Sequence, residues 1–363
     1  MRISLPKSDI SFSADPDQSL LDAALAACLN LPHSCKGGNC GSCRARLLQG
    51  EVYYPNGPPL GLSDAEIAEG FVLLCQARGR SDLSIEAQEI TTPDEARIKR
   101  LPARIEHSVH LSHDVMGLYL KLPAAESFGF AAGQYVDIML PGGRRRSFSI
   151  ASSPQNSRLL ELHVRRVAGG EFSAPLFDKD ARKLLLTLEG PLGQFVYRPG
   201  GAPMLLVGGG TGLAPLLSML RQEIANGLER EMLLYWGVRS ERDLYAHALL
   251  EELAREAGLP ARSPPAGGRP GAARRPHLVY VPVLSEPSHD WPGARGFVHE
   301  AVLRDIDDLE KYDVYAAGPP AMIAAVRHEF GARGVAANRL FFDSFDYAPD
   351  TVLRQRTSAV TKS

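Results

Sequence analysis

The alternation of apolar and polar positions changes twice along this 363-residue chain. In the first 90 residues, short alternating runs predict strands and one run of small apolar residues predicts a helix. The expected elements are strands at 2–5, 10–13 and 84–87 and a helix at 20–29. We expect residues 1–90 to form one small domain and the polar, aperiodic stretch 91–99 to be a linker.

The second pattern, from residue 100 to residue 198, is almost entirely strand-like, with turn signals at short spacing. Such a pattern predicts a central antiparallel β-barrel. The candidate strands cover residues 115–122, 134–140, 146–151, 160–167 and 183–188.

The third pattern, residues 199–363, alternates apolar strands with amphipathic helices, which predicts an α/β domain with a parallel, doubly wound sheet. The strands are expected at 204–207, 232–237, 278–284, 313–316 and 340–345, and the helices at 214–225, 246–257, 296–304 and 321–330. A Pro-, Gly- and Arg-rich stretch at 259–277 interrupts the alternation, and we expect a flexible surface insertion there.

Charge and hydropathy exclude two classes of function. The net charge is −2, which argues against nucleic-acid binding by bulk electrostatics. The uncharged run 199–220 is long enough to span a bilayer, but its six Gly and three Pro predict a strand, a loop and a helix start instead. The first ten residues alternate like a strand and not like a signal peptide, so we expect a cytoplasmic protein with no membrane segment.

Four of the five cysteines have a spacing that indicates a metal cluster. Cys35, Cys40 and Cys43 form C-x4-C-x2-C, with Cys75 further along the chain, the spacing of plant-type [2Fe–2S] ferredoxins. Gly37, Gly38 and Gly41 would let the backbone wrap closely around a cluster. The alternative, a structural zinc site, usually takes two close ligand pairs, and only one is present. The fifth cysteine, Cys28, falls in the predicted helix and is expected to be a buried core thiol.

Several motifs stand at predicted strand ends, where ligands bind in α/β proteins. The strand-end motif R-S-F-S at 146–149 puts a cation and an aromatic ring on one face, which suits a pyrophosphate beside a planar ring. G-G-E-F-S at 169–173 opens a helix and suits phosphate. V-G-G-G-T-G-L-A-P at 207–215 departs from G-x-G-x-x-G but allows a dinucleotide to cross the strand end. Two further stretches, Y-A-A-G-P-P-A-M at 315–322 and residues 235–245 with Arg239, also lie at the carboxyl ends of predicted strands.

The order of these motifs resembles the ferredoxin–NAD(P)H reductase family, in the subgroup with an N-terminal plant-type [2Fe–2S] ferredoxin domain. That subgroup includes reductase components of multicomponent oxygenases and CDP-6-deoxy-glucoseen reductase. The resemblance implies a β-grasp-like ferredoxin domain, an FAD-binding barrel and an NAD(P)H-binding domain. One departure is Ala317, because the family usually has Cys before this Gly-Pro pair.

The resemblance also implies roles for individual residues. Ser149 would approach flavin N5, and Thr211 and Phe345 would stand beside the reacting rings. Phe148, more often Tyr in the family, would lie against the flavin. The expected FAD ligands are Arg146, Phe148, Ser149, His163, Val164, Arg165, Gly169, Gly170 and Ser173. The expected nicotinamide dinucleotide ligands are Gly208, Gly209, Gly210, Thr211, Gly212, Arg239, Gly318, Pro319 and Met322.

The implied reaction is electron transfer from NADH, with NADPH as the alternative donor, through FAD to the [2Fe–2S] cluster. The acceptor would be a separate terminal enzyme, either an oxygenase component or a deoxysugar dehydrase. Two rival functions are a redox-sensing iron–sulfur flavoprotein with no electron-transfer partner and a flavin reductase that releases reduced flavin. We expect His107, His110, His113 and His163 to be surface or hydrogen-bonded side chains and not metal ligands.

Overall fold

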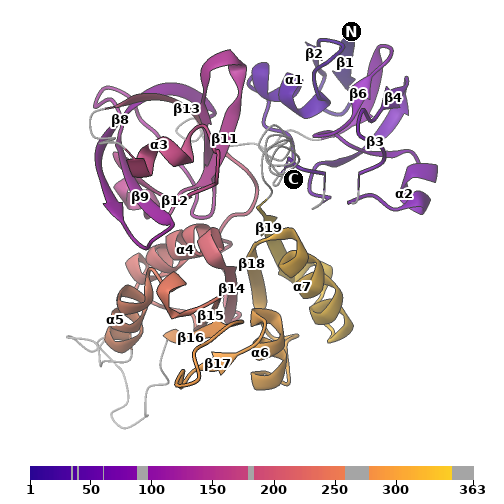
Figure 1. Ribbon diagram of the computed structural model, residues 1–363. Helices are drawn as coiled ribbons and strands as arrows, with labels where there is room; N and C mark the ends of the chain where they lie inside the picture. The colour runs from indigo at the N-terminus through magenta and orange to yellow at the C-terminus, as the bar shows by residue number, and fades with distance from the viewer. Residues whose placement is uncertain are drawn as a thin grey trace, which may run out of the picture.

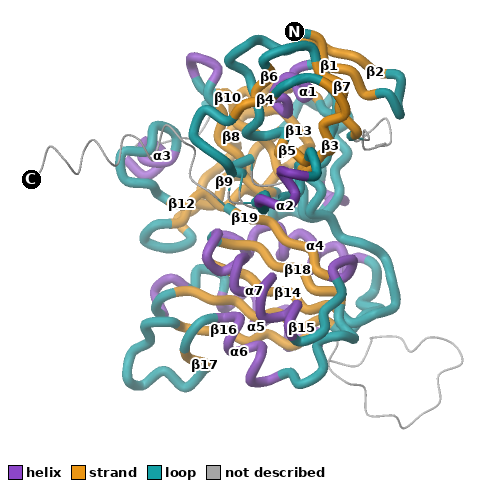
Figure 2. The backbone as a smooth tube through the Cα atoms, turned by 90° about the vertical axis from the view of Figure 1, so that its right-hand side faces the viewer, coloured by secondary structure: helices purple, strands orange, loops and turns teal. Residues whose placement is uncertain are grey.

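A computed structural model describes residues 1–33, 36–38, 41–59, 61–87, 97–178, 184–257 and 278–345. The described elements gather into three bodies, which we call the N-terminal, central and C-terminal domains (Figure 1). The N-terminal and central domains lie side by side, and the C-terminal domain lies below them in both views (Figures 1 and 2). The expected insertion at 259–277 lies outside the described residues.

The N-terminal domain packs a mixed sheet against one helix, a β-grasp-like arrangement. Its five-stranded sheet has the order β2-β1-β7-β3-β5, and β4 pairs with β6. Residues such as Ile3, Leu5 and Leu20 are fully buried between the sheet and α1. The elements are β1 (Arg2–Leu5), β2 (Ile10–Ser13), α1 (Leu20–Ala26), β3 (Arg44–Gln49), β4 (Val52–Tyr53), α2 (Asp64–Ala68), β5 (Phe71–Leu73), β6 (Arg78–Gly79) and β7 (Leu83–Glu86).

The end of α1 corrects one prediction. The helix begins after Ser19, whose hydroxyl accepts a hydrogen bond from the Asp22 amide at 3.1 Å. It ends at Ala26, earlier than predicted, because Cys28 adopts a left-handed φ of 60° that a helix does not allow. Cys28 is exposed, so the prediction of a buried core thiol is wrong.

The central domain is an antiparallel sheet that curls on itself. Its six strands have the order β11-β10-β13-β8-β9-β12, and every neighbouring pair is antiparallel. A single bridge between Ile150 and Leu162 brings the two edges together around an apolar interior. The elements are β8 (Lys99–His110), β9 (Val115–Lys121), β10 (Tyr135–Met139), β11 (Arg145–Ser149), β12 (Leu159–Arg165), α3 (Ser173–Asp178) and β13 (Leu185–Leu192).

The C-terminal domain has the predicted parallel sheet, in the order β17-β16-β15-β14-β18-β19. Helices α4 and α5 cover one face, and α6 and α7 cover the other. The elements are β14 (Met204–Gly209), α4 (Leu213–Ala225), β15 (Met232–Val238), α5 (His247–Ala257), β16 (Leu278–Leu284), β17 (Ala294–Arg295), α6 (Val298–Asp305), β18 (Asp313–Gly318), α7 (Pro320–Ala332) and β19 (Leu340–Ser344). Of the helices in the described ranges, none has the length and apolar character needed to cross a membrane.

Candidate functional site

Two of the four expected cluster ligands meet in the core of the N-terminal domain. Cys43 directly precedes β3 and Cys75 follows β5, and the pairing of these strands brings the two residues together. Their Sγ atoms lie 3.2 Å apart and both side chains are buried. Cys35 and Cys40 lie outside the described residues. A buried pair of soft sulfur donors, on segments far apart in the sequence, fits an iron–sulfur cluster.

The backbone of the cysteine loop is left-handed at three described positions. Gly38 and Gly41 have φ values of 82° and 74°, as their glycine identity predicts. The third position is Lys36, with φ 52°, whereas Gly37 is not left-handed. A non-glycine residue with positive φ is uncommon. Its presence beside Cys35 indicates that other contacts hold Lys36 in place.

The R-S-F-S strand is β11, and its alternation is as predicted. Arg146 and Phe148 stand opposite Ile138 and Val136 of β10 and are both half-buried. The ring of Phe148 lies 5.3 Å from the ring of Phe172, measured between centroids. Ser149, the last residue of the strand, is buried. A cation, an aromatic ring and a hydroxyl therefore lie along one short strand.

The turn after β12 brings a hydroxyl and two glycines close together. The Ser173 hydroxyl accepts a hydrogen bond from the Val167 amide at 3.0 Å. A Cβ atom on Gly170 would lie 2.6 Å from that hydroxyl oxygen, so a larger residue would displace it. At Gly169, with φ 70°, a Cβ would meet nothing within 4 Å. The turn is compact on one side and open on the other, which fits the binding of an extended phosphate group there.

His163 lies in a buried network that joins the central and C-terminal domains. Its Nε2 lies 3.0 Å from the Glu161 carboxylate and its Nδ1 lies 3.0 Å from the Tyr245 hydroxyl. Arg221 of α4 donates to the same carboxylate at 2.6 Å. Burial would raise the pKa of Glu161, but His163 and Arg221 outweigh burial and lower it to about 2. His163 is thus a hydrogen-bonded histidine, as expected, and its network fixes two domains against each other.

The glycine loop at the end of β14 lies very close to the Gly-Pro turn after β18. A Cβ on Gly212 would lie 2.0 Å from the carbonyl oxygen of Ala317. A Cβ on Gly209 would lie 2.7 Å from the Met322 sulfur and 2.9 Å from Pro319 Cδ. Only glycine allows this approach. The loop and the Gly-Pro turn after β18 therefore form one continuous surface.

Phe345, predicted beside the reacting rings, and Arg165, predicted at the FAD, also reach this surface. The Phe345 amide, just after β19, donates to the Gly318 carbonyl at 2.9 Å. A Cβ on Gly210 would lie 3.1 Å from a guanidinium nitrogen of Arg165, and Arg165 pairs with Asp114 at 3.0 Å. The carboxyl ends of β14, β18 and β19 thus meet the end of β12, the arrangement in which open α/β sheets bind ligands.

Thr211 and Arg239 lie at the edges of this surface. Thr211 is half-exposed in the turn between β14 and α4, and Arg239 is exposed after β15. Beyond Arg239, the Ser240 hydroxyl donates to Asp243 at 2.9 Å, and Glu241 accepts from the Ser288 amide at 2.9 Å. Both acidic side chains of this stretch are therefore held in hydrogen bonds, Asp243 to Ser240 and Glu241 to Ser288.

The sequence interpretation missed the contact between the N-terminal and central domains. The Lys36 ammonium pairs with Asp137 of β10 at 2.7 Å, and the ring of Tyr135 meets the edge of the His33 ring. Burial, followed by the nearby charge of Lys36, lowers the pKa of His33 to about 4. Its Nδ1 donates to the Leu31 carbonyl at 2.7 Å. A lone carboxylate within the apolar run Tyr135–Met139 was the available signal.

Comparison with known families matches all three domains. Residues 4–79 match the 2Fe-2S iron-sulfur cluster binding domain, and residues 102–197 match the oxidoreductase FAD-binding domain. Residues 206–263 and 269–328 match the oxidoreductase NAD-binding domain. The fold and the site together thus define an NAD(P)H-dependent iron–sulfur flavoprotein oxidoreductase.

Individual relatives cover nearly the whole chain. The CDP-6-deoxy-L-threo-D-glycero-4-hexulose-3-dehydrase reductase of Yersinia pestis is 35% identical over 95% of this chain and 98% of its own length. The reductase subunit of an aromatic O-demethylase from Amycolatopsis is 36% identical over 91% of this chain and 95% of its own. The crystal structure of the Amycolatopsis cytochrome P450 reductase GcoB has a TM-score of 0.76 and 34% identity, covering 95% of this chain and 98% of that one.

The chain belongs to the ferredoxin–NAD(P)H reductase family with an N-terminal [2Fe–2S] domain. Its cofactors are a [2Fe–2S] cluster, FAD and a nicotinamide dinucleotide. Its relatives are reductases, and one is described as the electron transfer component of a xylene/toluene monooxygenase, which supports the electron-transfer interpretation over the redox sensor.

Proposed function

We propose that this chain takes electrons from NADH and delivers them singly, through FAD and the [2Fe–2S] cluster, to a separate terminal enzyme. The observation that carries the proposal is a chain of contacts. The cysteine loop contacts the strands that include R-S-F-S, and the central domain contacts the glycine loop. Lys36 joins the first two through Asp137, and Arg165 joins the central domain to the third. These contacts would hold the three sites in fixed positions for electron transfer within one molecule.

The central domain would hold FAD on β11 and on the turn after β12. Arg146 would bind the pyrophosphate, Phe148 would lie along the ring system and Ser149 would donate to its edge. The amides of Gly169 and Gly170, with the Ser173 hydroxyl, would bind phosphate oxygens. The main chain of His163, Val164 and Arg165 would line the same groove, a role supported by the rigid network around Glu161.

The C-terminal domain would hold the dinucleotide across the glycine loop. Gly208 to Gly212, with Thr211 among them, would contact its phosphates, and the exposed Arg239 would pair with the adenosine end. Gly318, Pro319 and Met322 would border the nicotinamide, with Phe345 over its edge. The hydrogen bond from Phe345 to Gly318 supports this grouping.

When bound, FAD accepts a hydride from NADH and can release electrons one at a time, which matches the one-electron cluster. The side chains supply position and exclude water, and hydride transfer requires no acid or base among them. Ser149, Thr211 and Phe345 would accordingly orient rings and would not exchange protons.

The proposed acceptor is a dehydrase or an oxygenase component, because a dehydrase reductase and a dioxygenase reductase component both match nearly the whole chain. We place the protein in the cytoplasm, where thiolates stay reduced and NADH is abundant. The proposed domain limits are residues 1–90, 100–198 and 199–363, joined by a linker at 91–99.

The test is reconstitution with each kind of acceptor. Holoprotein, NADH and either a CDP-sugar dehydrase or an oxygenase component are mixed, and NADH loss and product are measured together. Stoichiometric product with one acceptor supports the proposal and identifies the partner class. If NADH is oxidised but neither acceptor gives product, and free reduced flavin accumulates in solution, the protein is a flavin reductase and the proposal is wrong.

A further inference from the structure

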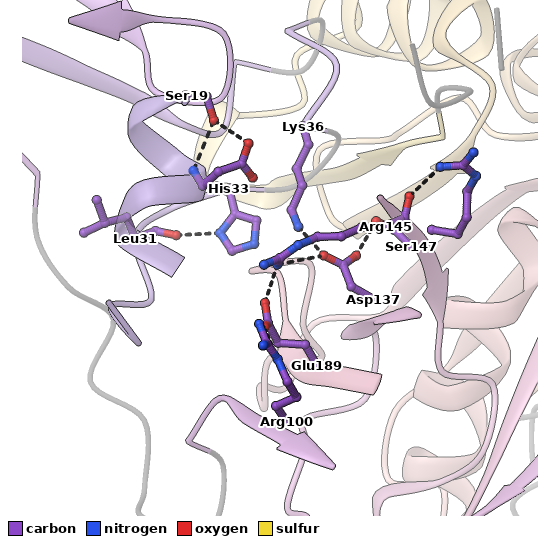
Figure 3. Close-up of polar contacts among 11 residues, drawn as sticks. Ser19, Leu31, His33, Lys36, Arg100, Asp137, Arg145, Ser147 and Glu189 are labelled. Carbon is purple, nitrogen blue, oxygen red and sulfur yellow. Dashed lines mark hydrogen bonds and ion pairs between the residues drawn. The ribbon is translucent and has the colours of Figure 1, made fainter. Parts of the chain in front are cut away.

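Asp137 is a completely buried carboxylate at the boundary between the central and N-terminal domains. Its cross-strand neighbours are Ser147 on β11 and Glu189 on β13. The Ser147 hydroxyl donates to Oδ1 at 2.5 Å, and an Arg145 guanidinium nitrogen lies 3.7 Å from Oδ2 (Figure 3). A buried carboxylate is costly unless cations and donors surround it. Because Arg145 lies 3.7 Å away, Asp137 needs a second cation at closer range.

Lys36 supplies that cation from the other domain. Its ammonium lies 2.7 Å from Asp137 Oδ2, although the residues are 101 positions apart. The ammonium also lies 5.3 Å from the centroid of the Tyr135 ring, two residues before Asp137 on β10. Burial would raise the pKa of Asp137, but Lys36, Ser147 and Arg145 hold it below its usual value. The carboxylate is therefore ionised and paired across the boundary.

Lys36 is also anchored to the fourth cysteine segment. The side-chain amide of Gln76, directly after Cys75, donates to the Lys36 carbonyl at 2.7 Å. The left-handed backbone of Lys36, with φ 52°, is one that L-residues other than Asn and Asp rarely adopt. Such a conformation persists where its surroundings over-determine it. Lys36, which lies in the loop of three cysteines, therefore contacts both the Cys75 segment and strand β10 of the central domain.

The charges around Asp137 make it the critical member of this contact. Arg145 bridges toward Glu189, and Arg100 pairs with the same carboxylate at 2.8 Å. The described group therefore holds three cations and two carboxylates. Without the Asp137 charge, Lys36 would lose its carboxylate partner, and Arg145 would keep Glu189 and the weaker influence of Asp22 of α1. The attraction between the domains would then be weaker.

We propose that Asp137 is a positioning residue for internal electron transfer, which holds the cluster loop, through Lys36, against the strand that ends at Ser149. The step concerned moves one electron from reduced FAD to the oxidised cluster, with NADH as the source. This inference rests on the proposed function. Asp137 and Lys36 contribute no ligand to either cofactor; they fix the relative position of the two segments that do.

The test uses four variants of the holoprotein in anaerobic stopped-flow. Asp137→Asn and Lys36→Met each remove one charge, and Lys36→Arg keeps it. Asp313→Asn is the matched control, because Asp313 pairs with the buried Arg230 at 2.6 Å inside the C-terminal domain, away from this boundary. Flavin reduction by NADH and the later reduction of the cluster are followed separately, and the cluster midpoint potential is measured by redox titration.

We expect Asp137→Asn and Lys36→Met to slow flavin-to-cluster transfer at least about tenfold, equivalent to about 1.4 kcal/mol of docking. Flavin reduction by NADH should stay within twofold of wild type, and Lys36→Arg and Asp313→Asn should transfer at close to the wild-type rate. The double variant should be no slower than the slower single variant, because both remove one interaction. Removal of a nearby negative charge should raise the cluster potential, and removal of the positive charge should lower it.

Wild-type transfer rates in Asp137→Asn and Lys36→Met, at full FAD and iron content, would overturn the proposal. Cluster midpoint potentials that shift in the same direction in both variants would also overturn it, because a purely structural disturbance would shift them alike. If the Asp137→Asn variant loses its cluster, the transfer rate of Lys36→Met decides the test. The Lys36 side chain is partly exposed, so its replacement disturbs the fold less. A wild-type protein whose cluster stays oxidised while FAD is reduced would instead refute the proposed function.

Discussion

Substitution of Gly212 by Ala tests the contact between the glycine loop and the turn after β18. Gly212 has φ −59°, which alanine adopts without strain, so the effect is purely steric. The new Cβ would lie 2.0 Å from the Ala317 carbonyl oxygen, where ordinary contact begins at 3.4 Å. One of the two segments must therefore move by about 1.4 Å, the difference between those distances.

A displacement of this size has a predictable cost. Misplacement by 1 Å near reacting atoms can slow a reaction roughly 100-fold, and overpacking costs about 1–3 kcal/mol of stability. We expect Gly212→Ala to reduce FAD with NADH about 100-fold more slowly, measured by anaerobic stopped-flow. Gly209→Ala should lose less, because its Cβ would lie 2.7 Å from the Met322 sulfur and 2.9 Å from Pro319 Cδ, a smaller overlap than at Gly212.

Gly331→Ala is the control for this series. Gly331 lies within α7, and a Cβ there would meet nothing within 4 Å. Alanine should stabilise the helix by up to about 1 kcal/mol and leave flavin reduction unchanged. Flavin reduction at the wild-type rate in Gly212→Ala, at full FAD content, would show that this contact does not position the dinucleotide.

Three further predictions concern other parts of the molecule. Ala317 is completely buried where the family usually has Cys; we expect Ala317→Cys to accelerate flavin reduction several-fold in stopped-flow, and an unchanged rate would make the alanine a neutral difference. Cys43→Ser should abolish cluster absorbance and NADH-driven cytochrome c reduction but retain ferricyanide reduction, and cytochrome c reduction that persists would contradict the electron order. Because the folded-state pKa of Glu161 is depressed to about 2, its stabilisation is complete above pH 4.5 and fades as the pH falls toward 2. Urea unfolding should show wild type losing about 2 kcal/mol more than Glu161→Gln between pH 5 and pH 3, whereas parallel losses would mean that Glu161 is not held ionised.

Local pattern was sufficient where an element carries its own periodicity. The strands β1 and β2 have the predicted limits. In the parallel sheet of the C-terminal domain, five of the six strands lie within two residues of prediction, and the two-residue strand β17 was not predicted. Their apolar positions repeat with the period of the structure that they form. The glycine and Gly-Pro motifs were also found from local sequence, because close backbone approach requires glycine at particular positions.

Local pattern failed where distant residues decide the structure. Strand β3 reads Arg-Ala-Arg-Leu-Leu-Gln, with an alternation too weak to predict, and it forms because β5 and β7 pair with it. The helix end at Ala26 depends on the left-handed Cys28, which its residue type does not indicate. The contact of Lys36 with Asp137 joins residues 101 positions apart, and no short motif encodes it.

The most direct test of the central claim is the order in which the cofactors are reduced. Anaerobic holoprotein is mixed with one equivalent of NADH, flavin absorbance is followed by stopped-flow, and the reduced cluster is followed by freeze-quench electron paramagnetic resonance. We expect flavin bleaching to come first, the cluster signal to grow at the expense of reduced flavin, and flavin-depleted protein to give no cluster signal. A cluster that NADH reduces in flavin-depleted protein, or before any flavin bleaching, would contradict this expectation.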